Sequence, residues 1–107
     1  MPEEMQDLNK LIATGRAVKE YELNGIKFVL SSPTSKQLLE AEDVASIIAQ
    51  YISKVGSEEF TTPERKKLLQ NKLLTEAPGA LMDTLFGICK DFRDFQDGLI
   101  KDTLKKN

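Results

Sequence analysis

The dipeptide Asn24-Gly25 most constrains the fold of this chain, because it separates two short runs in which apolar and polar residues alternate. Both central positions of a type I′ turn require a positive φ, which Asn and Gly tolerate better than other residues. The segment ELNGIKFVL therefore predicts a β-hairpin, which we place at residues 17–31. Because an isolated hairpin is only marginally stable in water, we expect this one to pack against helices or to donate its edges to another sheet.

A helix is expected directly after the hairpin. Thr34 is a good N-cap residue, and Gln37 three positions later completes the pattern of a capping box. Apolar residues continue at helical spacing to about Val55, and Gly56 offers a stop. We therefore predict one long helix from Thr34 to Val55 whose second half is central to the core.

Two further helices are predicted toward the C-terminus. Thr62-Pro63-Glu64 combines an N-cap, a first-turn proline and an acid, and the leucine-rich helix that follows ends before Pro78-Gly79. The last helix is expected over residues 80–104. Its apolar residues recur at alternating steps of four and three, which is a heptad-like seam; they are Leu81, Leu85, Ile88, Phe92, Phe95 and Leu99.

The N-terminal segment predicts a separate amphipathic helix over residues 2–14. Met5, Leu8, Leu11 and Ile12 form a one-sided apolar stripe, and Gly15 ends the pattern. Such an arm has a polar back and needs a surface on which to pack.

Together these elements predict a mainly α fold of the α+β class, with an N-terminal helix and a β-hairpin followed by a three-helix bundle-like core. We expect a single domain over residues 1–107, made of a helical arm (1–15), the hairpin (17–31) and a helical region (34–104).

Composition excludes several classes of function. The net charge of −2 argues against a protein that binds nucleic acid by neutralising phosphates. The chain has no histidine and one cysteine, which removes the usual proton shuttle, any internal disulfide and any multi-thiol metal site. No apolar run approaches the length of a membrane span, and the acidic start MPEEMQDLNK resembles neither a signal nor a transit peptide. We therefore expect no enzyme, no cofactor and no membrane partner.

The candidate reactive residues have plain structural interpretations beside the functional ones. Cys89 lies within an apolar helical face and is expected to be a buried hydrophobe rather than a reactive thiol. Asp91, Asp94 and Asp97 recur every three positions, and the functional interpretation is a divalent-cation site or an acidic docking strip, but their spacing fits no Ca²⁺ loop. We expect them to form a solvated helix face.

Two other charged clusters are given similar interpretations. Glu40, Glu42 and Asp43 are expected to favour a helix N-terminus, with partner contact as the alternative. The basic run at residues 65–67 is expected to be a helix face, too short to hold nucleic acid.

The order of the elements resembles that of a known family. ELNGIKFVL, the link SSPTSK, the helix start QLLEAED and the later leucine-rich KKLLQNKLL are similar, over about residues 18–90, to the small tail assembly chaperones of tailed bacteriophages. The link lacks the Arg-Pro-Leu-Thr often found in that family.

The resemblance implies a non-enzymatic chaperone that binds tape-measure protein or tail-tube subunits in the host cell cytoplasm. Helix-in-groove binding would use Leu81, Leu85, Ile88, Phe92 and Phe95 as its lining, an assignment made from their amphipathic spacing. The apolar faces either close on one core or include a docking groove or a homo-oligomer seam. Two other functions stay open: a structural component of the virion in its baseplate or tail, and a small regulatory or enzyme-accessory domain outside phage biology.

Overall fold

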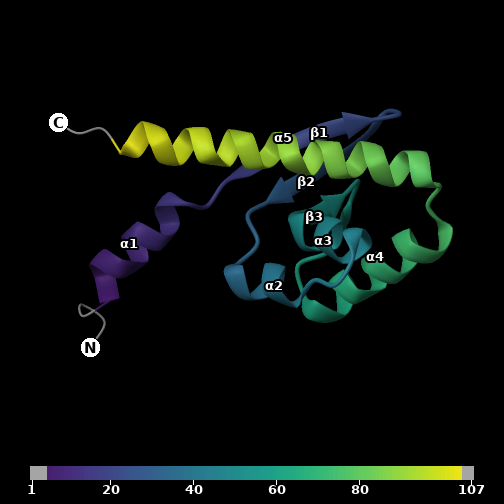
Figure 1. Cartoon of the computed structure of the whole chain (residues 1–107), viewed down its shortest axis with the longest axis horizontal. Helices are drawn as coiled ribbons and strands as arrows, with labels where there is room; N and C mark the ends of the chain where they lie inside the picture. Colours follow the sequence, from purple (N-terminus) through teal and green to yellow (C-terminus); the bar gives the residue numbers. More distant parts are fainter. Residues whose placement is uncertain (1–4, 105–107) are drawn as a thin grey trace.

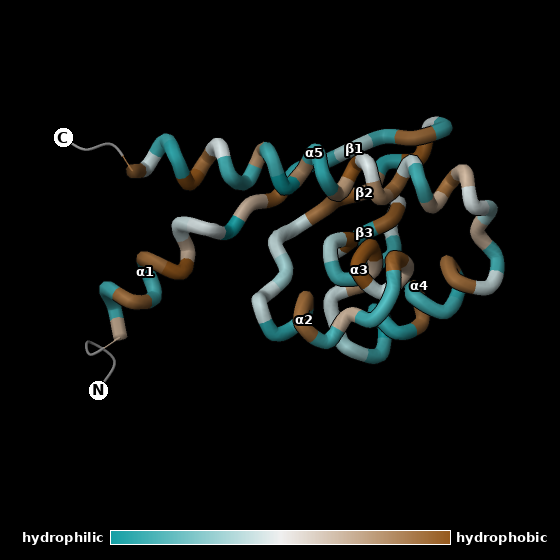
Figure 2. Tube along the Cα trace, in the orientation of Figure 1, coloured by the Kyte–Doolittle hydropathy of each residue, from teal (hydrophilic) through white to brown (hydrophobic). Residues whose placement is uncertain are grey.

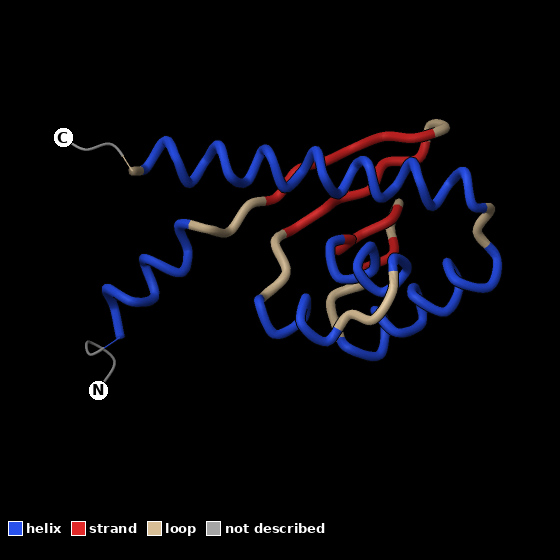
Figure 3. Tube along the Cα trace, viewed as in Figure 1, coloured by secondary structure: helices blue, strands red, loops and turns tan. Residues whose placement is uncertain are grey.

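The structure, a computed structural model, describes residues 5–104 of the chain and confirms a mixed α+β fold that is mainly helical (Figures 1 and 3). In chain order its elements are α1 (Gln6–Thr14), β1 (Val18–Leu23), β2 (Ile26–Ser31), α2 (Ser35–Glu40), α3 (Val44–Tyr51), β3 (Ile52–Val55), β4 (Glu58–Glu59), α4 (Pro63–Glu76) and α5 (Gly79–Thr103). The start of the predicted N-terminal helix, at residues 2–4, lies outside the described residues.

The predicted hairpin is confirmed. β1 and β2 pair antiparallel with Leu23 opposite Ile26, so the turn consists of Asn24 and Gly25. Both turn residues have positive φ, 55° and 77°, as a type I′ turn requires. The hairpin is part of a larger antiparallel sheet of order β1-β2-β3-β4, in which β2 also pairs with β3. The edge of β2 that faces away from β1 is therefore paired within the chain.

The single helix predicted from Thr34 to Val55 is wrong. The capping box at Thr34 is present, but α2 ends at Glu40 and a second helix, α3, begins at Val44. Asp43 starts that second helix, because its carboxylate accepts a hydrogen bond from the Ser46 N–H at 2.8 Å while the Ser46 hydroxyl accepts one from the Asp43 N–H. This local cap interrupts an apolar pattern that is otherwise continuous.

The second half of the same segment forms strands. Ile52–Val55 pairs with β2, and Gly56 has a φ of 60°, which allows the tight turn into β4. The three-helix description of residues 34–104 therefore misses β3 and β4. The run ISKV is rich in β-branched residues, and a neighbouring strand is available to pair with it.

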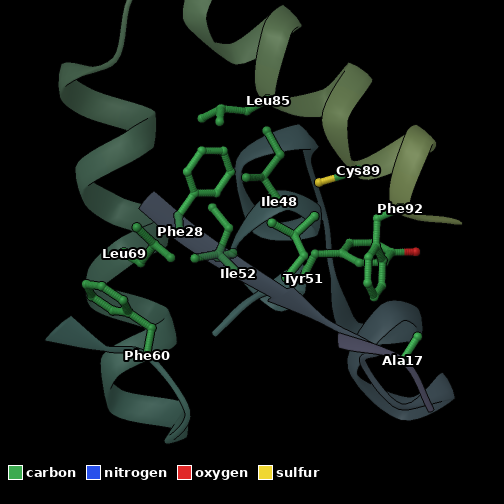
Figure 4. Close-up of a cluster of buried hydrophobic side chains, with 12 residues drawn as sticks. Ala17, Phe28, Ile48, Tyr51, Ile52, Phe60, Leu69, Leu85, Cys89 and Phe92 are labelled. Atoms are coloured by element: carbon green, nitrogen blue, oxygen red, sulfur yellow. The ribbon is translucent and has the colours of Figure 1, made fainter. Parts of the chain in front are cut away.

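The core lies between the sheet, α3, α4 and the first half of α5 (Figure 4). Leu30, Ile48 and Phe92 are its largest fully buried side chains, and they come from β2, α3 and α5. The rings of Tyr51 and Phe92 meet edge to face with centroids 5.9 Å apart. These contacts hold α5 across the sheet.

Two helical segments extend beyond this core. α1 has no buried residue, and it stands apart from the sheet, as does the C-terminal end of α5 (Figures 1 and 2). The chain is correspondingly elongated, with extents of 47 × 30 × 26 Å. The two segments meet near Gly15, just after α1, where the Gly15 carbonyl accepts a hydrogen bond from the Gln96 side chain of α5.

The position of the core on α5 predicts unequal effects along that helix. Phe92→Ala should lower the free energy of unfolding by about 3–5 kcal/mol, because the ring is fully buried. Leu99→Ala should lower it by only about 1–2 kcal/mol, because that side chain lies outside the core cluster and is 38% exposed. Urea unfolding followed by circular dichroism measures both, and similar losses for the two variants would contradict the location of the core.

Candidate functional site

The five residues predicted to line a partner groove do not form one open surface. Leu85 and Phe92 are buried in the core, and Leu81, Ile88 and Phe95 are half-buried against it. The expectation that all five line a groove is therefore corrected. The heptad-like seam of α5 is covered by the sheet and α3 of the same chain, so it serves mainly as core.

An open apolar groove lies instead beside α4, and we call it the α4 groove. It encloses about 500 Å³ between β4, α4 and the start of α5, and its apolar lining consists of Phe60, Leu68, Leu69, Leu73, Ala77, Pro78 and Leu81. Leu68 is 52% exposed within it. Leu81 is thus the one predicted lining residue that borders this groove, and the leucines of α4 were predicted only as a helix face.

Two ion pairs form the rim of the α4 groove. Arg65 Nη2 lies 3.8 Å from Glu58 Oε2, and Lys72 Nζ lies 3.2 Å from Glu76 Oε1. The Arg65 guanidinium also stacks over the Phe60 ring at 4.8 Å. All four charges are partly exposed, so these pairs contribute little to stability and are free to exchange partners.

A second, smaller groove lies between α5, α2 and α3, and we call it the α5 groove. It encloses about 270 Å³ and is lined by Leu38, Ile47, Tyr51, Phe86, Cys89, Lys90 and Arg93. Both charged lining residues are cations: the Arg93 guanidinium donates to the Tyr51 hydroxyl at 3.3 Å, and the Lys90 ammonium lies over the Phe86 ring. This groove combines an apolar floor with a positive rim.

Cys89 lies in the floor of the α5 groove as the predicted buried hydrophobe. Its side chain is almost fully buried, and burial raises the pKa of its thiol to about 12. The thiol is therefore protonated at neutral pH and is a poor nucleophile.

The basic run at residues 65–67 contains a residue that the sequence interpretation missed. Lys66 is buried, and its Nζ donates hydrogen bonds to the carbonyls of Ala49, Gln50 and Ile52 at 3.1, 3.3 and 2.8 Å. The first two belong to the last turn of α3, where carbonyls have no partner within the helix. A spacing signal was present, because Lys66, Leu69 and Leu73 recur at steps of three and four on the core side of α4.

Of the three aspartates predicted as a solvated face of the last helix, Asp91 makes contacts within the fold. Asp91 accepts a hydrogen bond from the Tyr21 hydroxyl at 2.7 Å and pairs with Lys19 at 3.5 Å, which joins β1 to α5. The Tyr21 hydrogen bond, with help from the Lys19 charge, lowers the pKa of this carboxyl. Asp94 and Asp97 are exposed, as predicted. Across residues 5–104 no group of three metal-ligating side chains comes together.

The described helices include none that is both long and apolar enough to cross a membrane. Comparisons with protein-family models, with curated proteins and with solved structures found no match to this chain. The functional interpretation therefore depends on the geometry of the grooves.

Lys66 generates a testable prediction. Lys66→Met leaves three carbonyls without their buried donor and should lower the free energy of unfolding by about 1–3 kcal/mol. The deficit should grow with pH, because burial lowers the pKa of Lys66 from 10.5 to about 8 and the unfolded chain then binds more protons between these values.

Urea midpoints of both proteins near pH 7 and near pH 10 test this prediction. The raised pKa of Cys89 acts in the opposite direction above its ordinary value of 9.0, but it does so equally in both proteins and cancels in their difference. A deficit that stays constant with pH would contradict the assigned role of the buried amine.

Proposed function

We propose that this protein is a non-enzymatic tail assembly chaperone of a tailed bacteriophage, which binds helical segments of tape-measure protein or tail-tube subunits in the host cell cytoplasm. The assignment to that family rests on the resemblance in the order of the sequence elements, and the observation that supports binding of a helical partner is the α4 groove, an open apolar groove of about 500 Å³ beside a folded core. A chaperone of this kind has to cover apolar stripes reversibly, and an amphipathic helix lying in a groove does so without chemistry.

The lining of the α4 groove fits an amphipathic helix. Leu68, Leu69 and Leu73 supply one wall from α4, and Leu81 supplies the facing wall from α5. The rim carries two acids and two bases, so it favours a partner with mixed charges on both sides of its apolar stripe. The rim ion pairs are weak and can re-pair with such a partner, which suits reversible binding.

The absence of an enzymatic role is part of the proposal. The sequence contains no histidine, and the thiol of Cys89 is protonated and buried. The polar hollow beside Lys66 has three glutamines and two glutamates in its lining, but the lysine ammonium is already bonded to three carbonyls. Neither place offers a paired nucleophile and base.

The sheet edge favours a second candidate function, a structural component of the virion. β1 is the longer of the two edge strands of the sheet, with six residues, so it presents backbone groups to which a strand of another protein could pair. Mass spectrometry of purified particles separates the candidates, because a chaperone should be absent from the finished virion and a structural component should be present in stoichiometric amounts.

Co-expression with a tape-measure fragment tests the α4 groove. The wild-type protein should keep the fragment soluble, and Leu68→Asp should abolish this effect because a carboxylate in the groove cannot face an apolar stripe. Leu39→Asp is the matched control, since Leu39 is 85% exposed and lies outside both grooves. Equal solubilisation by the wild type and Leu68→Asp, with both proteins folded by circular dichroism, would refute the groove assignment.

A further inference from the structure

The α5 groove has cations at its rim and no acid in its lining. Among the described residues, those that line it include Lys90 and Arg93 and no carboxylate, beside an apolar floor of Leu38, Ile47 and Phe86. The whole chain has 17 acidic and 15 basic residues, so a groove with two cations alone departs from the composition of the protein. The rim therefore favours a negatively charged occupant.

Aromatic groups, rather than carboxylates, hold the two cations in place. The Arg93 guanidinium donates a hydrogen bond to the Tyr51 hydroxyl at 3.3 Å. The Lys90 ammonium lies 5.4 Å from the centre of the Phe86 ring. Within residues 5–104 neither cation belongs to an ion pair. Both side chains are thus positioned beside the apolar floor with their charges unpaired.

The nearest acids along α5 leave this rim open. Asp94 follows Lys90 by four positions and Asp97 follows Arg93 by four, and both aspartates are exposed. A base on the N-terminal side of an acid gives the weaker orientation of such a pair. Exposed charges attract weakly, so a carboxylate inside the groove can replace them. In the α4 groove, by contrast, each cation that forms the rim already pairs with an acid.

The spacing of the two cations fits a helical occupant. Lys90 and Arg93 stand three positions apart on α5, which is about 4.5 Å along the helix axis. Carboxylates three or four positions apart on another helix have a similar interval. The apolar stripe next to those carboxylates would then meet the floor of the groove, as it does when an amphipathic helix binds in a groove.

We propose that the α5 groove binds an acidic amphipathic helix of a partner protein. Two carboxylates one turn apart would face Lys90 and Arg93, and the adjoining apolar side chains would cover Ile47 and Phe86. This partner differs in charge from the mixed-charge helix proposed for the α4 groove. The two contacts use different surfaces, so the proposal does not depend on the tail-assembly function, and either can fail alone.

Titration of the ¹⁵N-labelled full chain with synthetic helical peptides tests the proposal. The first peptide has a leucine stripe and glutamate at its polar positions, the second has lysine in place of each glutamate, and the third has alanine in place of each leucine. The first should shift the NMR signals of residues that line the α5 groove, and it should bind at least about tenfold more tightly than either of the others. Its affinity should fall with added salt, because salt screens the attraction at the rim.

Removal of the two charges tests the role of the rim. Lys90→Gln combined with Arg93→Gln should weaken binding of the glutamate peptide about tenfold and remove most of its salt dependence. Glutamine keeps a donor for the Tyr51 hydroxyl, and circular dichroism checks that the variant is folded. Lys10→Gln combined with Lys101→Gln is the matched control, because it removes the same two charges at exposed positions outside the groove and should bind like the wild type.

Several outcomes would overturn the proposal. They are equal binding of the glutamate and lysine peptides, full affinity of the folded Lys90 and Arg93 variant, and signal shifts confined to the α4 groove. Binding of decanoate at the α5 groove without binding of the glutamate peptide would assign the groove to a small anionic amphiphile instead. Sedimentation equilibrium that shows a dimer which the peptide cannot dissociate, with the α5 groove covered, would assign it to a second copy. Leu68→Asp should bind the glutamate peptide like the wild type, which separates this test from that of the α4 groove.

Discussion

The packing of the first half of α5 across the sheet is the contact on which the rest of the structure depends. Phe92 fills the space beside Tyr51 of α3, while Leu85 lies in the same cluster as Phe28 and Leu30 of β2. An isolated hairpin is only marginally stable in water. The contact with α5 covers the apolar face of this hairpin and so stabilises it. Because α5 has 25 residues and the core uses only part of it, the helix extends past the sheet. The C-terminal end of α5 therefore lies beyond the sheet (Figure 1).

Polar contacts at the two ends of α3 decide the shape of the middle of the chain. At the start, Asp43 and Ser46 cap the helix and separate it from α2. At the end, Lys66 binds three carbonyls at the point where the helix gives way to β3. A buried amine is tolerable only because these acceptors satisfy its hydrogens. Together the two contacts limit α3 to Val44–Tyr51 and allow the sheet to gain its third and fourth strands.

The two grooves differ in the charges at their rims. The α4 groove has a balanced rim and a wide apolar lining, whereas the α5 groove is narrower and has a positive rim. Both grooves include residues of α5: Leu81 borders the α4 groove, and Phe86, Cys89, Lys90 and Arg93 border the α5 groove.

The sequence by itself determined the elements that are specified by neighbouring residues. Asn24-Gly25 required a turn with positive φ, Thr62-Pro63 started α4, and Pro78-Gly79 separated α4 from α5. Burial of Cys89 also followed from the apolar face around it. These features depend on the backbone preferences of single residues and on the spacing of near neighbours, and both can be read directly from the amino-acid sequence.

Only the tertiary structure decided the rest. The run ISKV became a strand because β2 was beside it to pair, and Lys66 was buried because the end of α3 supplied three acceptors. The seam containing Leu85 and Phe92 is core rather than groove because the sheet and α3 cover it. Helical spacing fixes which side of a helix is apolar, but what lies against that side is set by residues far away in the chain.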